Sequence, residues 1–140
     1  MAYFKWSGAI ELGHPLIDAQ HRQLLALAEA VVDPLADTTG QRPGAQALQA
    51  LIDFAEKHFA MEQGLMRDAG YVDTDAHAHA NQHASLLAEL NTYCSRVRHG
   101  HNTDPAGMVA FLWNWIVLHV DGADRQLVQW LKSREQAGKA

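Results

Sequence analysis

Histidine recurs along this chain at positions that would share a helical face with leucine, valine and other apolar residues. In four stretches the apolar residues repeat every three or four positions, which predicts four amphipathic helices. Residues four apart on a helix differ by about 40° and lie on the same face. Each stretch places at least one histidine on its apolar face, and together these are His21, His58, His79, His83 and His119. Buried imidazoles need polar partners, so we expect the four helices to converge where such partners are available.

Proline and glycine mark where the four helices begin and end. Pro15 and Pro105 suit a first helical turn, whereas Gly70 and Gly100 follow the second and third apolar stretches. No stretch alternates polar and apolar residues as a strand does. The sequence therefore predicts an all-α protein, an up-down-up-down four-helix bundle over about residues 15–135. The 140 residues are expected to form a single domain.

An arm of about residues 1–14 precedes the predicted bundle. It contains Tyr3, Phe4 and Trp6, which are costly to leave in water, so we expect the arm to pack on the helices. His14 stands directly before Pro15 and is expected in the cap region of the first helix. Asp18 lies three residues before His21. There it could either orient an imidazole N–H or favour the helix start by its charge.

The amino-acid composition limits the possible binding partners and the cellular compartment of the protein. The net charge of −5 argues against nucleic acid as a partner, because phosphate binding needs clustered lysine and arginine. Cys94 is the one cysteine, so no internal disulfide can form, which fits a reducing cytoplasm. The first residues lack the basic and apolar regions of a signal peptide. No apolar run approaches the roughly 20 residues that span a bilayer, so we expect a cytoplasmic protein without a membrane span.

The inward-facing set holds five histidines and also Glu62, four residues after His58. One buried histidine with a backbone or water partner is ordinary, but five on converging helices indicate a shared metal centre. Imidazole and carboxylate suit zinc, copper, iron or nickel, and the absence of thiolate ligands disfavours structural zinc. Five imidazoles are too many for one tetrahedral ion, which favours two ions joined by a carboxylate. His77 lies two residues before His79 and is expected to point outward.

Four short motifs resemble, in order and spacing, those of the hemerythrin family, most closely its single-domain bacterial members. They are "IDAQH" (17–21), "HFAME" (58–62), "HANQH" (79–83) and "HVDGAD" (119–124). "GLM" after the second motif, "GY" after the second helix and a tryptophan before the last histidine also match. Each motif alone is weak, whereas the four in order are specific, and the resemblance covers nearly the whole chain.

The resemblance implies a cofactor of two non-haem iron ions with a bridging oxo or hydroxo group. It implies that one iron is held by His79, His83 and His119 and the other by His21 and His58. Glu62 and Asp124 would bridge the two ions. The iron with two histidines would keep an open position, where this family binds dioxygen.

Asp124 is identified as a candidate ligand through the resemblance alone. It lies five residues after His119, about 140° around an ideal α-helix. Its side chain must therefore reach round, or the helix must be locally distorted, for example by a π-bulge that Gly122 would ease. Asp121 is the rival on sequence alone, but its angle from His119 is worse, about 200°. We interpret Asp121 as a solvated surface acid.

Five apolar residues lie beside an expected ligand or one turn from it and are predicted to line an oxygen pocket: Leu24, Phe59, Trp115, Ile116 and Val120. The same residues also suit core packing, and both roles are compatible. Their only polar donor is the Trp115 N–H. A pocket without a placed acid cannot readily protonate and cleave the O–O bond, which favours reversible binding over catalysis.

We therefore expect a non-enzymatic protein that binds dioxygen for storage, transport or delivery, with an unknown protein as a possible recipient. One alternative is a module that senses oxygen, nitric oxide or redox state. Sensing is less favoured, because no output domain comes after "LKSREQAGKA" in this sequence. The other alternative is a di-iron peroxidase or nitric oxide reductase.

Overall fold

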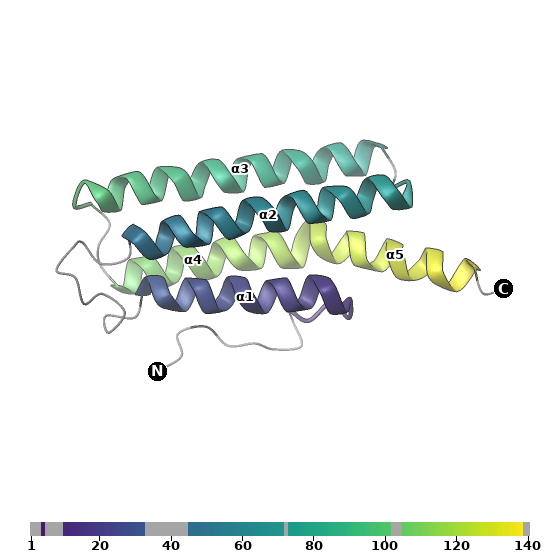
Figure 1. The fold of residues 1–140 in the computed structure, drawn as a ribbon, viewed down its shortest axis with the longest axis horizontal. Helices are drawn as coiled ribbons and strands as arrows, with labels where there is room; N and C mark the ends of the chain where they lie inside the picture. The colour runs from purple at the N-terminus through teal and green to yellow at the C-terminus, as the bar shows by residue number, and fades with distance from the viewer. Residues whose placement is uncertain (1–3, 5–9, 33–44, 72, 102–104, 139–140) are drawn as a thin grey trace.

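The helices form four antiparallel passes along the chain (Figure 1). The computed structural model describes Phe4 and residues 10–32, 45–71, 73–101 and 105–138. The segments are α1 (Pro15–Val32), α2 (Ala45–Ala69), α3 (Asp73–Arg98), α4 (Pro105–His119), the π-helical turn η2 (Val120–Asp124) and α5 (Arg125–Gly138). Since α4, η2 and α5 succeed one another without a break, they make a single pass. The described residues contain no strand, and the predicted all-α bundle is confirmed.

The helix starts match the predicted proline positions. α1 begins at Pro15 and α4 begins at Pro105. The His14 side chain caps α1, because its Nδ1 accepts a hydrogen bond from the Ile17 N–H at 3.3 Å. The expectation that His14 belongs to the cap region is confirmed.

The two glycines predicted to end helices do follow α2 and α3. Gly70 and Gly100 have φ angles of +69° and +84°, a left-handed conformation that glycine adopts without steric cost. Beyond Gly70, the Tyr71 N–H donates to the Met66 carbonyl at 2.9 Å. This is the hydrogen bond of a Schellman motif, and it satisfies a carbonyl that the last helical turn leaves free.

The arm packs on the bundle through its described residues. Phe4 is buried, and its ring stacks on Trp113 with centroids 6.0 Å apart. Asp18 fixes the end of the arm, since its two carboxylate oxygens accept the N–H groups of Leu12 at 2.9 Å and Gly13 at 2.8 Å. Asp18 therefore binds the backbone before α1 rather than an imidazole. Tyr3 and Trp6 lie outside the described residues.

The apolar faces of the passes meet in one core. α1 packs against α2 and α4, and α3 packs against the same two helices. Each helix contributes fully buried side chains, among them Leu24, Leu51, Leu90 and Leu112. Cys94 is also buried, as expected of a small apolar residue on the inner face of α3.

One helix corrects the expectation that no stretch is apolar enough to cross a membrane. The continuous helix Ala106–Glu135 meets that criterion by length and composition alone. One such helix is weak evidence for a span, because core helices pass the same test. This helix buries His119 and Asp124 inside the bundle, where they face other protein side chains.

Replacing Leu112 by alanine tests the packing of this core. The Leu112 side chain is 0% exposed, so Leu112→Ala should lower the free energy of unfolding by about 2–5 kcal/mol. Leu118→Ala is the matched control on the same helix, since Leu118 is 51% exposed and its loss should change stability by less than about 0.5 kcal/mol. Urea unfolding of the two variants measures both effects. Equal losses would contradict the described orientation of α4.

Candidate metal centre

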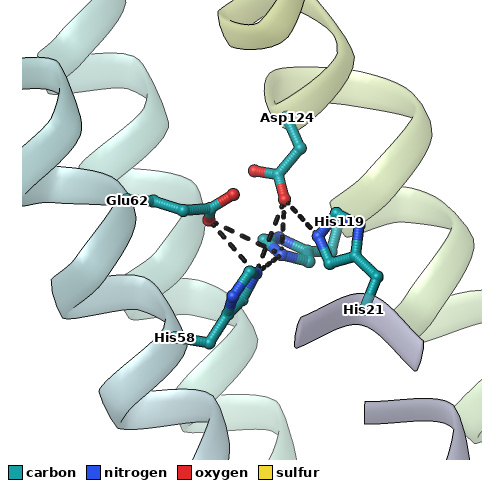
Figure 2. A group of neighbouring side chains, drawn as sticks. All are labelled: His21, His58, Glu62, His119 and Asp124. Carbon is teal, nitrogen blue, oxygen red and sulfur yellow. Dashed lines mark hydrogen bonds and ion pairs between the residues drawn. The ribbon is translucent and has the colours of Figure 1, made fainter. Parts of the chain in front are cut away.

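Seven buried side chains from all four passes meet in the middle of the bundle. None is more than 1% exposed, and five of them are drawn in Figure 2. They are His21 from α1, His58 and Glu62 from α2, His79 and His83 from α3, His119 from α4 and Asp124 from η2. The structure thus brings together every residue that the sequence analysis named for the centre. Because His77 is exposed, the expected difference in orientation between it and His79 is also found.

The Asp124 carboxylate contacts three helices at once. Its Oδ2 lies 2.8 Å from His21 Nε2 and 2.7 Å from His119 Nε2, and its Oδ1 lies 2.7 Å from His79 Nε2. His58 Nε2 is farther, at 3.7 Å from Oδ2. A single carboxylate therefore joins α1, α3 and the fourth pass at the centre. Figure 2 shows its contacts with His21 and His119.

Glu62 is the second carboxylate of the same cluster. Its Oε1 lies 3.1 Å from His83 Nε2 and 3.4 Å from His58 Nε2. The Nε2 atoms of His79 and His119 are each 3.7 Å away. Both Glu62 oxygens are buried and have no hydrogen-bond partner of good geometry among the described residues. A buried carboxylate in this condition is costly, and a cation at the centre would satisfy it.

The π-helical turn explains how Asp124 reaches the site. η2 covers Val120–Asp124, directly after His119. In a π-turn the hydrogen bonds run from residue i to residue i+5, so residues five apart return to the same face. The predicted local distortion is confirmed, and Asp124 lies on the face of His119. Asp121 points to solvent and pairs with Arg125 at 2.9 Å, as expected of a surface acid.

The donor atoms fall into two overlapping groups, each within 4.8 Å. The first group contains His21, His58, Glu62, His119 and Asp124, and the second contains Glu62, His79, His83 and Asp124. Only the two carboxylates belong to both groups, which is the position that bridging ligands would take. His119 lies in the group of His21 and His58, whereas the family resemblance places it with His79 and His83. Its Nε2 is 2.9 Å from His58 Nε2, close enough for direct contact between the two imidazoles.

The predicted pocket residues are all buried, and two of them contact histidines of the cluster. Phe59 stacks on His83 with ring centroids 4.0 Å apart and meets His119 edge-on at 4.9 Å. Trp115 also approaches His119, and its N–H donates to the Leu86 carbonyl at 2.9 Å. The one polar donor expected in the pocket is therefore engaged by the backbone. Leu24, Ile116 and Val120 complete the buried apolar set.

Burial and the two carboxylates set the charges of the cluster. Burial opposes protonation of His79, but Asp124 and Glu62 together outweigh it and raise the pKa of His79 to about 9. For His83, burial prevails and lowers the pKa of the imidazole. Burial alone would raise the pKa of Asp124, yet His119 and then His21 and His58 hold it well below its usual range.

Sequence reasoning missed a set of glutamines beside the donors. Gln20 precedes His21, and its Oε1 accepts a hydrogen bond from His58 Nδ1 at 2.6 Å. Gln63 comes directly after Glu62 and lies 3.4 Å from His83 Nδ1. Both are adjacent to expected ligands in the quoted motifs. Helical geometry gave no reason to single them out, because neighbours in sequence point about 100° apart.

Comparison with known proteins identifies the family of this chain. Residues 12–131 match the model of the hemerythrin HHE cation binding domain. The chain belongs to the hemerythrin family. It is 32% identical over 134 residues to a bacteriohemerythrin of Ralstonia nicotianae, an alignment covering 96% of this chain and 93% of the relative.

Two further relatives are less similar to this chain. A bacteriohemerythrin of Stenotrophomonas maltophilia is 26% identical over 95% of this chain and 84% of its own length. A hemerythrin-like protein of Naegleria gruberi is 26% identical over 86% of this chain and 87% of its own length. The resemblance inferred from the four motifs is confirmed.

The raised pKa of His79 predicts how the metal-free protein responds to pH. The folded pKa of about 9 exceeds the ordinary value of 6.5, so the stabilisation is complete below pH 6.5 and is lost as the pH rises through 9. Urea unfolding should show His79 contributing about 3 kcal/mol less at pH 9.5 than at pH 6.5. His77→Gln should keep this loss, and His79→Gln should abolish it. The same pH dependence in wild type and His79→Gln would contradict the described contacts.

Proposed function

We propose that this protein binds dioxygen reversibly at a di-iron centre held by the seven buried side chains. The observation that carries the proposal is the shared position of Glu62 and Asp124 in both donor groups. Two carboxylates and five imidazoles suit two iron ions better than one, with an oxo or hydroxo group as a third bridge. The names of the relatives, bacteriohemerythrin and hemerythrin-like protein, support the same assignment.

The residues present fit such a centre by their chemistry. The unsatisfied oxygens of Glu62 and the imidazole Nε2 atoms facing the two carboxylates are groups that metal ions bind. We propose that His79, His83 and His119 serve one iron and that His21 and His58 serve the other. Contact between His58 and His119 at 2.9 Å would then give way to contacts with separate ions. Ferrous ions held there would supply the electrons and the open coordination position for dioxygen.

The surroundings favour binding over catalysis. The five apolar residues of the proposed oxygen pocket are all buried, and the Trp115 N–H already donates to Leu86. The one polar donor on these five residues is therefore not free to deliver a proton to a bound ligand. General acid catalysis of O–O cleavage requires such a donor. Exclusion of water by the same residues would slow side reactions.

We further propose that residues 1–140 act as a single cytoplasmic domain that stores, carries or delivers dioxygen. Sensing and di-iron reductase or peroxidase chemistry use the same type of centre and differ in the step after ligand binding. A sensor would pass a conformational change to a partner, and an enzyme would release a product.

Oxygen titration of the reduced protein tests the proposal. Protein loaded with iron and reduced without air should take up one dioxygen per two irons, seen as a visible absorption band. The band should disappear under vacuum and return with air, because the pocket offers no acid for turnover. Uptake that ends in hydrogen peroxide or water, without recovery of dioxygen, would contradict the binding role and favour an enzyme.

Two histidines on one helix provide a matched test of the iron ligands. His79→Ala should lower iron content below two per chain and remove the visible band, since His79 is buried among the donors. His77→Ala should leave both unchanged, since His77 is exposed. Metal analysis and absorption spectroscopy measure these effects. Loss of iron in His77→Ala would show that the proposed ligand face of α3 is wrong.

A further inference from the structure

Three glutamines beside the donors connect neighbouring helices around the bundle. Gln20 on α1 reaches His58 on α2, and Gln63 on α2 reaches His83 on α3. Gln82 on α3 donates through Nε2 to the Leu118 carbonyl at 3.4 Å, directly before His119 on α4. Each glutamine is adjacent in sequence to a donor on its own helix. Gln20 and Gln63 contact an imidazole of the next helix, whereas Gln82 contacts a backbone carbonyl.

The shortest of these contacts determines a tautomer. The Gln20 Oε1 lies 2.6 Å from His58 Nδ1, and an amide oxygen can only accept a hydrogen bond. His58 Nδ1 must therefore carry the proton and donate it. In the neutral ring the other nitrogen, Nε2, then carries the lone pair, and it lies 2.9 Å from His119 Nε2. It faces Glu62 Oε1 at 3.4 Å and Asp124 Oδ2 at 3.7 Å, toward the centre (Figure 2).

We propose that Gln20 is a positioning residue for the metal centre, which fixes the ring of His58 and aims its Nε2 at the metal. Histidine ligands generally donate their second N–H to an oxygen acceptor, and loss of that acceptor weakens metal binding. Here the acceptor is a neutral amide rather than a carboxylate. An amide holds the ring without adding negative charge, so it leaves His58 a weaker electron donor than a carboxylate would. Gln20 therefore favours the ferrous state that binds dioxygen.

This inference rests on the proposed function, because it assumes that iron binds at the centre. The experiment separates the two claims. If wild-type protein binds no iron, the proposed function fails. If wild-type protein binds two irons and the Gln20 variants behave as wild type, only the role of Gln20 fails.

Gln20→Met and Gln20→Glu differ in whether an acceptor remains. Gln20→Met keeps the length of the side chain without the acceptor, and it should weaken Fe²⁺ binding by about 10–100-fold in competition with a chelator. Gln20→Glu restores an acceptor with negative charge, so it should recover the affinity. It should also lower the reduction potential of the iron-loaded protein. Gln23→Met and Gln23→Glu are matched controls at an exposed position on the same helix, and they should change neither quantity.

Nuclear magnetic resonance of the zinc-loaded protein gives a readout independent of iron chemistry. A hydrogen-bonded His58 Nδ1 proton should be visible in wild type and Gln20→Glu and should be lost or exchange rapidly in Gln20→Met. Wild-type affinity and an unchanged Nδ1 proton in Gln20→Met would overturn the proposal. If Gln20→Met does not fold, Gln20→Glu decides: a lower reduction potential supports the role of Gln20, and a wild-type potential overturns it.

Discussion

The contacts of Asp124 with imidazoles from three helices bring the passes of the bundle together at one buried point. Charged and polar groups at this depth are tolerated only when each has a partner. Glu62 shows the cost of an incomplete arrangement, since both of its buried oxygens lack a well-formed hydrogen bond among the described residues. The centre therefore constrains the helices around it, and a bound cation would convert this constraint into stability.

The backbone of the fourth pass is also adapted to this centre, through its π-helical turn. A regular α-helix would direct Asp124 away from His119, and one π-turn over Val120–Asp124 returns it to the centre. Departures of this kind from a regular helix are common at functional sites. Gln82 lies beside the turn, because a Cβ added at Gly122 would lie 3.6 Å from its amide nitrogen. The backbone irregularity and the ligand geometry thus depend on each other.

Periodicity along the chain predicted much of this arrangement. The spacing of four residues separated the buried His79 from the exposed His77, and proline and glycine located the helix ends, since these features depend only on local geometry. Asp124 was found only through the family motif, because its position requires a non-α turn. The contact of Gln20 with His58 depends on which helices pack together, and no single helix encodes that information.

We propose that one cluster from four helical passes holds two ions bridged by Glu62 and Asp124. Crystals of the iron-loaded protein, with anomalous diffraction recorded at the iron absorption edge, test it most directly. We expect two iron peaks within the cluster, both contacting Glu62 and Asp124, with the five imidazoles divided between them. A single peak, or two peaks of which either lacks Asp124 as a ligand, would contradict this proposal.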